Sequence, residues 1–433
     1  MPRRIYYGYW LVVASFLAQF VSLGIFSYVL SSFMTPMIDE LGWTRAEFTL
    51  SRSIGQVAMA VTGFFIGVAV DRYGGKPLML VGTTILSVSL GLHSQVTELW
   101  QWIVLNGLAL TIGCALLGNL VVNVTLAKWF VEKRGQAIAW ATMGVSMGGI
   151  VITPLVTYLI DTIDWRTTWL LLAVGTAIVM YPVALVMRRA PEDHGLHPDG
   201  KTADDVAQGR ALKAAEDYAR SLTRRQALRT GSFYALVLAF GLFSINIVVM
   251  LLQTVPYLTD AGFTRTQAAL AITAASVPAM IAKPIWGYFI DHMPAQPLAS
   301  LSAAFTGLSL FGIVAAVDGG SLVWIYAGYF LLGIGWGGMM PMQEVIWGSF
   351  FGRRYLGAVR SAGLPFALAL GASAPLLVSH YHDVTASYQG ALAVVAGLNV
   401  MSGVLILWVP APNKDAILAG TQSATTSRDI HSS

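Results

Sequence analysis

The sequence predicts an all-α membrane protein whose twelve transmembrane helices form two six-helix bundles in parallel pseudo-repeat. Three observations predict it: an unusually apolar composition, twelve long apolar segments, and an internal repeat. Hydrophobic residues make up 56% of the 433 positions, glycine adds 43 more, and only 11% are charged. Soluble domains carry about 25% charged residues. The mean hydropathy of +0.65 therefore excludes a cytosolic enzyme, a fibrous protein and a disordered regulator.

The apolar segments are long enough to be membrane spans, since a helix needs about 20 apolar residues to cross the hydrocarbon core. Twelve such segments occur between polar interruptions. They lie at 9–34, 46–70, 78–95, 100–127, 135–160, 167–187, 232–258, 267–290, 298–317, 321–347, 358–380 and 388–409.

A long polar stretch divides the spans into six and six. We expect an N-terminal bundle at 1–187, a cytoplasmic central loop at 188–231, a C-terminal bundle at 232–409, and a cytoplasmic tail at 410–433. Residues 203–228 are rich in Ala, Arg, Lys, Glu and Asp, which favours one or two short surface helices.

Positive charge is sorted by side. Twenty of the 26 Lys and Arg residues fall on the side of both termini, and only Arg45, Arg166 and Arg265 fall on the other. Because cytoplasmic loops are enriched in Lys and Arg, we expect both termini in the cytoplasm of a multi-pass cell-membrane protein. The same sorting accounts for the net charge of +4 without nucleic acid as a partner.

The halves align with a shift of 220 residues, mainly at loops and helix ends, where glycine and proline set the backbone. The matched pairs are Pro36 with Pro256, Gly42 with Gly262, Gly67 with Gly287, Asp71 with Asp291 and Pro77 with Pro297. Two bundles in parallel topology place a cavity between them near the middle of the membrane.

The loop between spans 2 and 3 reads Gly67-Val-Ala-Val-Asp71-Arg72-Tyr-Gly-Gly-Lys76-Pro, and a weaker copy runs from Gly287 to Asp291. It resembles the signature loop of the major facilitator superfamily. The resemblance implies a conformational latch that joins the cytoplasmic helix ends in the outward-facing state, and its residues are Gly67, Asp71, Arg72, Lys76 and Asp291. The alternative is a solvated turn with ordinary cytoplasmic charges.

Further stretches resemble one branch of that superfamily, the monocarboxylate transporters and the oxalate/formate antiporters. They are Lys128 to Ala137, the end of span 1 from Pro36 to Ala46, and Lys283 to Asp291. The second has a form familiar in bacterial members, which implies the inner membrane. This chain has Lys283 where the branch usually has arginine, and Ala279 where some members have aspartate. The resemblance thus implies carboxylate binding but assigns no proton-coupling residue.

Lys283 is also a candidate from its position alone. It lies about 22 Å and 12 Å from the two ends of its predicted helix, at 1.5 Å per residue. A cation at that depth costs about 2.5–3.5 kcal/mol on insertion scales, so we expect it to face a watery cavity and bind an anion. The alternative is an ion pair with an acid on another span. Arg52 and Arg360 lie only about 9 Å and 4.5 Å inside their spans and can reach lipid headgroups.

Five other side chains are candidates for substrate binding. Asn119 and Asn123 lie one turn apart on one face of span 4. They could donate amide hydrogens to a carboxylate, or they could only form hydrogen bonds between helices. Asn246 could line the cavity from span 7, and Trp336 could form its wall, although the surrounding glycines also suit close helix packing. Arg360 could act as a gate or a second anion contact.

The function predicted is secondary active transport of a small organic anion, a monocarboxylate moved with a proton, by alternating access. The alternatives are transport of a larger aromatic or drug-like compound, including a vitamin, and organic-anion exchange. Span 5 lacks the Gly-Pro-x-x-Gly-Gly pattern of drug antiporters. Lys283 itself could carry the proton, because Asp39, Glu40, Glu47 and Glu344 lie near span ends.

No enzymatic activity, cofactor or metal is expected. The single cysteine, Cys114, excludes a multi-cysteine metal site, and neither a HExxH pair nor a phosphate-binding GxxxxGK[ST] loop occurs. The expected partners are the organic anion, a proton and membrane lipid, and a monomer is sufficient.

Overall fold

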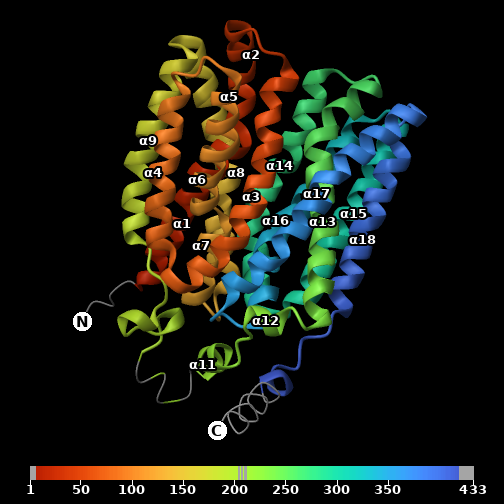
Figure 1. The fold of residues 1–433 in the computed structure, drawn as a ribbon. Helices are drawn as coiled ribbons and strands as arrows, with labels where there is room; N and C mark the ends of the chain where they lie inside the picture. Colours follow the sequence, from red (N-terminus) through yellow and green to blue (C-terminus); the bar gives the residue numbers. More distant parts are fainter. Residues whose placement is uncertain (1–5, 203–204, 206–207, 209–211, 419–433) are drawn as a thin grey trace, which may run out of the picture.

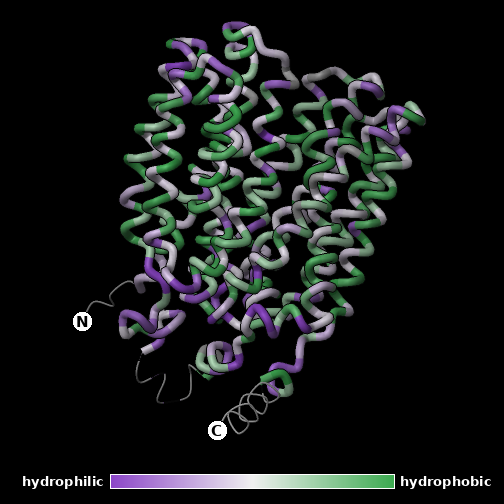
Figure 2. Tube along the Cα trace, viewed as in Figure 1, coloured by the Kyte–Doolittle hydropathy of each residue, from purple (hydrophilic) through white to green (hydrophobic). Residues whose placement is uncertain are grey.

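The computed structural model describes residues 6–202, 205, 208 and 212–418. Within them, 12 helices are long and apolar enough to cross a membrane, which confirms the predicted spans. Figure 1 shows them as two groups that stand side by side, and Figure 2 shows their hydrophobic middles and hydrophilic ends. The predicted tail lies mostly outside the described residues.

The first group comes from the N-terminal half. Its elements are α1 (Tyr7–Gly24), η1 (Ile25–Val29), α2 (Leu30–Leu41), α3 (Arg45–Tyr73), α4 (Gly75–His93), α5 (Leu99–Trp102), η2 (Ile103–Leu110), α6 (Thr111–Leu117), α7 (Asn119–Trp129), α8 (Arg134–Thr162) and α9 (Trp165–Val186). The π-helical elements η1 and η2 interrupt spans 1 and 4 without ending them.

The second group comes from the C-terminal half. Its elements are α13 (Gly231–Asp260), α14 (Arg265–His292), α15 (Ala295–Asp318), α16 (Leu322–Phe351), α17 (Leu356–Thr385) and α18 (Gln389–Trp408). The connecting segment contains η3 (Glu192–His194), η4 (Pro198–Gly200), α11 (Leu212–Ala219) and α12 (Arg224–Ala227). We call the end of the molecule that carries this segment the loop face, and the other end the opposite face.

The repeat reappears in helix-capping detail. Gly42 and Gly262 both have positive φ, 69° and 90°, and each precedes a helix that starts with a capping box. Thr44 and Glu47 form the first box, and Thr264 and Gln267 form the second. A capping box satisfies backbone N–H groups that the first turn leaves unpaired, so both halves start their second span in the same way.

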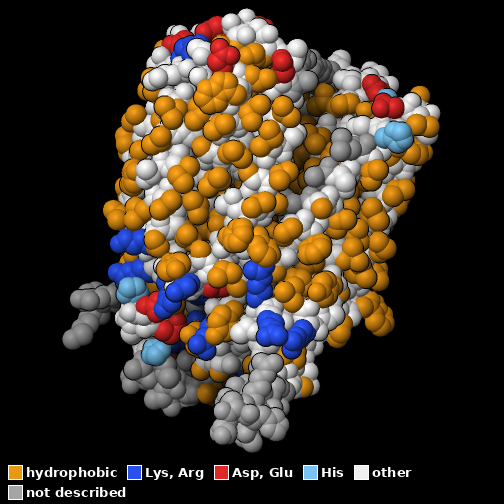
Figure 3. Space-filling model, in the orientation of Figure 1, with side chains coloured by type: hydrophobic (Ala, Val, Ile, Leu, Met, Phe, Trp, Pro, Cys, Tyr) orange, Lys and Arg blue, Asp and Glu red, His pale blue; other side chains and the backbone are white. Residues whose placement is uncertain are grey.

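Packing between the two bundles is concentrated toward the loop face. One buried hydrophobic cluster unites the core of the first bundle with residues of the second bundle near that face, such as Phe240, Trp347 and Val359. A separate cluster, which includes Leu258, Leu310 and Leu392, fills the rest of the second bundle toward the opposite face. On the face of the molecule that it draws, Figure 3 shows an apolar band and a notch between the bundles at the opposite face. The bundles are thus packed together toward the loop face and, on the face drawn, parted by a notch at the other end.

Candidate functional site

Lys283 lies in α14 at the boundary between the bundles. Its side chain is only 6% exposed, and its ammonium group reaches across to α8 of the first bundle. There Nζ donates hydrogen bonds to the Thr142 carbonyl oxygen at 3.1 Å and to Ser146 Oγ at 2.7 Å. Both partners are neutral. The ammonium group of the second bundle is therefore held by the dipoles of two neutral groups of the first bundle.

Among the described residues, no carboxylate lies within ion-pair distance of Lys283. A buried cation held only by a carbonyl and a hydroxyl recovers part of its lost hydration energy. On its other side, α14 packs tightly on α16, where a Cβ at Gly337 would lie 2.7 Å from the Ala279 carbonyl oxygen.

Span 4 is broken next to Asn119. The backbone leaves the helix at Gly118, with φ −82° and ψ −168°, and α7 restarts at Asn119 without a side-chain cap. The buried Oδ1 of Asn119 has no hydrogen-bond partner. A half-helix that starts inside a membrane protein exposes N–H groups suited to anions. The apolar run predicted a continuous span 4, although the isolated Gly118 could have indicated the break.

Asn123 is turned to a different partner. Its Oδ1 accepts a 3.3 Å hydrogen bond from Nε2 of Gln19 in α1, and both side chains are buried. Gln19 was not among the predicted site residues, because one glutamine in an apolar run carries no periodic signal. The two candidates in span 4 thus differ: Asn119 has an unpaired oxygen, whereas Asn123 joins two helices.

Asn246 and Trp336 lie together in the second bundle. Trp336 Nε1 of α16 donates to Asn246 Oδ1 of α13 at 2.9 Å. Asn246 is fully buried, and its Nδ2 has no hydrogen-bond partner. Two residues predicted separately therefore form one polar contact between spans 7 and 10.

Arg360 is paired within its own bundle. Its Nε lies 3.3 Å from Oε1 of Glu344 in α16, and both side chains are buried. The guanidinium group also lies over the Trp347 ring, 5.4 Å from its centroid. Arg360 thus already has an anionic partner, unlike Lys283.

At the loop face, Asp71 joins the two bundles. Its Oδ2 accepts a 2.7 Å hydrogen bond from the backbone N–H of Ala358, at the start of α17. Its Oδ1 forms a 2.7 Å ion pair with Lys128. Gly67 permits this approach, since a Cβ there would overlap the Gly357 carbonyl oxygen and the Ser361 side chain.

Asp291 makes the matching contact from the second bundle. Its two carboxylate oxygens accept from the backbone N–H groups of Gly135 at 2.6 Å and Gln136 at 3.0 Å, at the start of α8. Gly287 packs closely here, because a Cβ would lie 2.6 Å from Ala139 Cβ. Carboxylates are favoured at helix N-termini by free N–H groups and the helix dipole.

Arg72 and Lys76 take no part in these contacts. Arg72 is exposed, lies 5.2 Å from the Tyr73 ring centroid, and offers its carbonyl oxygen to Arg189. Lys76 is exposed too, and no ion pair joins it to a described residue. The cation that forms an ion pair with Asp71 is Lys128. The sequence analysis named Lys128 only as the start of a stretch that resembles the monocarboxylate transporter branch.

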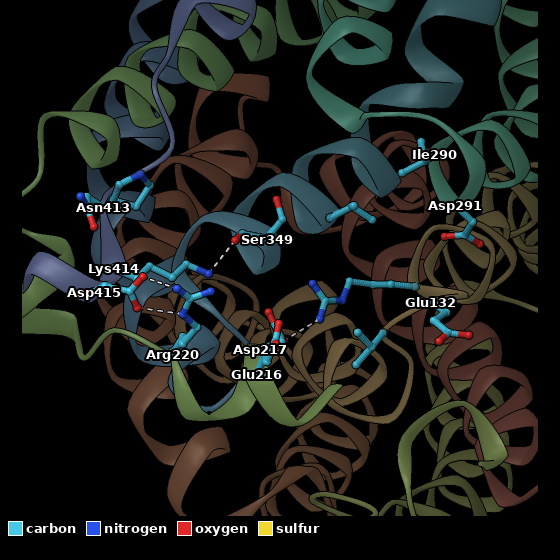
Figure 4. Close-up of a pocket in the computed structure, with 14 residues that line it drawn as sticks. Glu132, Glu216, Asp217, Arg220, Ile290, Asp291, Ser349, Asn413, Lys414 and Asp415 are labelled. Atoms are coloured by element: carbon cyan, nitrogen blue, oxygen red, sulfur yellow. Dashed lines mark hydrogen bonds and ion pairs between the residues drawn. The ribbon is translucent and has the colours of Figure 1, made fainter. Parts of the chain in front are cut away.

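The connecting segment adds a third contact between the bundles. Asp217 of α11 lies 3.3 Å from Arg134 of the first bundle and 3.9 Å from Arg353 of the second. Arg353 also donates to the Lys128 carbonyl oxygen at 3.0 Å. Figure 4 shows Asp217 beside a cavity of about 490 Å³, with Arg220 paired to Asp415 and Lys414 bonded to Ser349.

Comparison with known proteins agrees with this architecture. The family model described as the Major Facilitator Superfamily matches residues 15–373 and 254–430. The chain is 25% identical over 391 residues to monocarboxylate transporter 4 of Gallus gallus, covering 88% of this chain and 78% of that protein. It is 24% identical over 372 residues to the oxalate:formate antiporter of Oxalobacter formigenes, covering 84% and 82%.

A solved structure has the same fold. The proton:xylose symporter XylE superposes with a TM-score of 0.73 at 10% sequence identity, covering 93% of this chain and 96% of that one. These matches confirm the fold class and the family resemblance, and they identify a membrane transporter rather than an enzyme.

Proposed function

Because the chain belongs to the major facilitator superfamily, we propose that this transporter moves a small organic anion, a monocarboxylate together with a proton, by alternating access. The observation that carries the proposal is Lys283: a buried cation between the bundles, bonded to Thr142 and Ser146, with no carboxylate partner among the described residues. The names of two relatives, a monocarboxylate transporter and an oxalate:formate antiporter, also specify small carboxylates.

The geometry supports a way to couple binding to movement. A substrate carboxylate at Lys283 competes with the Thr142 carbonyl and the Ser146 hydroxyl for the same ammonium protons. The bonds from the ammonium group to Thr142 and Ser146 have neutral acceptors, whereas a carboxylate adds the attraction of a full opposite charge, so the carboxylate draws Nζ away from α8. Substrate binding thereby weakens a contact between the bundles.

We place the loop face in the cytoplasm, at the inner membrane of a bacterial-type cell. Twenty of 26 Lys and Arg residues lie on that side in the sequence, as cytoplasmic loops prefer. The arrangement described, closed at the loop face, is then the outward-facing state, and the contacts of Asp71 and Asp291 are its latch. Gly67 supports the latch by allowing close approach, and Arg72 and Lys76 supply flanking positive charge.

We assign Asn119 and the start of α7 a secondary role in holding the carboxylate. Asn246 and Trp336 form part of the wall on the second bundle, and Asn123 fixes α7 to α1 through Gln19. Arg360 serves as a gate residue through its pair with Glu344.

Uptake by proteoliposomes tests the proposal. Radiolabelled acetate, lactate and pyruvate are offered to the wild type, Lys283→Ala and Lys283→Arg. Lys201→Ala is the control, because Lys201 is a half-buried lysine of the connecting segment that pairs with Glu132. We expect Lys283→Ala to abolish uptake, Lys283→Arg to restore part of it, because a planar guanidinium fits a carboxylate differently, and Lys201→Ala to match the wild type.

Undiminished uptake by correctly inserted Lys283→Ala would overturn the role of the lysine. Uptake that is insensitive to a pH gradient and to an uncoupler would favour anion exchange over proton coupling. Thermal stabilisation by neutral ring compounds, and by no carboxylate, would favour the larger aromatic substrate instead.

A further inference from the structure

Arg52 of α3 is turned into the first bundle, not toward a headgroup as its depth in the sequence suggested. Its Nη1 donates to the Phe26 carbonyl oxygen, and its guanidinium carbon lies 4.1 Å from the centroid of the Phe26 ring. Phe26 belongs to the π-helical element η1, whose carbonyl groups are displaced from normal helical bonding. Because the Arg52 side chain points inward, it contacts span 1 instead of lipid headgroups.

The cation has no acidic partner. Among the described residues, no carboxylate lies within ion-pair distance of Arg52. A guanidinium group has five N–H donors, and one carbonyl oxygen uses one of them. Charged side chains within membrane spans normally pair or line a water-filled path. Arg52 therefore retains N–H donors that Phe26 does not use, and its charge is offset by the Phe26 ring but by no acid in the part of the chain that the structure describes.

These donors border a narrow cavity that holds about one water-sized particle. It is formed by spans 1, 2, 4 and 6, and both π-helical elements contribute to it. Its lining residues are Ile25, Phe26, Leu30, Ser51, Arg52, Asn106, Leu110, Thr111 and Trp169. The polar groups of Ser51, Asn106 and Thr111 bond mainly to one another and to backbone carbonyls.

Trp169 also lines this cavity and carries a second unused donor. The residue is 1% exposed, and its Nε1–H has no hydrogen-bond partner. Its ring is fixed by stacking on Phe33, with centroids 3.8 Å apart. An unpaired buried N–H group destabilises the folded state, so a partner that accepts hydrogen bonds would stabilise the bundle.

We propose that Arg52 and Trp169 form an anion site inside the N-terminal bundle, separate from Lys283. Its ligand is a small anionic group, either a free halide ion or one carboxylate of a substrate that carries two. The guanidinium group supplies charge and several donors, and the fixed indole N–H supplies one more from span 6. The size of the cavity limits the occupant to one small group.

Thermal unfolding of the purified full-length chain in nanodiscs tests the site. The melting temperature is measured in sodium bromide against sodium gluconate at equal ionic strength, and in malonate and succinate against acetate. We expect a saturable rise in Tm with bromide, or with the dicarboxylates but not acetate. The rise is lost in Arg52→Gln, reduced in Trp169→Phe, and kept in Arg166→Gln, which alters a half-buried arginine of the opposite face that pairs with Glu40.

A response to bromide identifies a free ion, and a response limited to dicarboxylates identifies a second substrate subsite. The proposal is overturned if no tested anion raises Tm, or if Arg52→Gln and Trp169→Phe respond like the wild type. Should Arg52→Gln fail to fold, Trp169→Phe and Arg52→Lys decide, because the first removes the indole N–H group but keeps an aromatic ring, and the second removes the planar fork but keeps the charge. If the ligand is a free halide, Lys283→Ala should keep the bromide response, so this site and the proposed transport site then fail independently.

Discussion

Asp71 and Asp291 make the same contact in opposite directions. Each ends the second span of its own bundle and accepts backbone hydrogen bonds at the start of the fifth span of the other, from Ala358 in one case and from Gly135 and Gln136 in the other. The two residues are related by the shift of 220 that relates the halves of the sequence. Opening of the loop face must break both contacts, so each should contribute to holding it closed.

Neutral amides at these positions should loosen the loop face. Asp71→Asn/Asp291→Asn keeps the shape of both side chains but weakens the attraction to helix N-termini and to Lys128. Spin labels on cysteines at Lys76 and Met293, both exposed, should move apart in double electron–electron resonance. The native Cys114 is buried, so the spin label should react with the two introduced cysteines. Asp161→Asn, at the opposite face, is the control, and unchanged distances in the double variant would contradict the latch.

A methyl group at Gly287 should separate the same helices. Its Cβ would lie 2.6 Å from Ala139 Cβ and 2.9 Å from the Gly135 carbonyl oxygen, and overpacking of this kind costs about 1–3 kcal/mol. We expect Gly287→Ala to lengthen the spin-label distance and slow uptake while the protein stays folded. Gly175→Ala, where nothing lies within 4 Å, should change neither. Equal behaviour of the two variants would rule out close packing as a determinant of closure.

The pair of Arg360 and Glu344 should show strong coupling in stability. Removing one member of a buried ion pair leaves an uncompensated charge and costs about 3–5 kcal/mol, whereas replacing both is often neutral. Arg360→Met and Glu344→Leu should each destabilise the protein more than the double variant, in thermal unfolding. If Arg360 is also a gate residue, the double variant should fold well but transport poorly. Additive effects on stability would show that the pair is not coupled.

Asp217 should hold α11 against both bundles. Asp217→Asn removes the charge that faces Arg134 and Arg353, so amide hydrogen exchange over 212–219 should become faster. Glu216→Gln is a matched control, because Glu216 is the exposed neighbour on the same helix. Protection that is equal in the two variants would mean that α11 is held by its other contacts.

Glu40 should give a small pH-dependent stability at the opposite face. The hydrogen bond from Trp165, followed in importance by the one from Arg166, lowers the pKa of Glu40 below its usual value. A lowered pKa in the folded state stabilises the protein above the unfolded pKa of about 4.3. That contribution, below about 1 kcal/mol for an exposed pair, is lost as pH falls through the folded pKa. The Tm difference between the wild type and Glu40→Gln should therefore shrink between pH 6 and pH 3, on the scale set by these pKa values. A constant difference would exclude the linkage.

Most of the fold could be predicted because the signals are local. Apolar runs set the twelve spans, and the pairing of Gly42 with Gly262 and of Asp71 with Asp291 revealed the repeat. The helices extend past several runs, as α17 does to Thr385, because their polar ends continue beyond the apolar segment. The break at Gly118 was missed, since one glycine in an apolar run is compatible with a continuous helix.

The choice of partners could not be predicted in the same way. Sequence spacing placed Lys283 deep in a span and Asp71 at a helix end, but it could not give Lys283 its neutral partners on α8 or Asp71 its contact with Lys128. Sequence spacing also could not predict that Arg52 points inward or that Arg360 pairs with Glu344. Composition and periodicity determine how the chain crosses the membrane, because burial in lipid acts on each segment separately. Which side chains meet depends on the rotation, tilt and closeness of helices far apart in the chain, and the tertiary structure alone decides that.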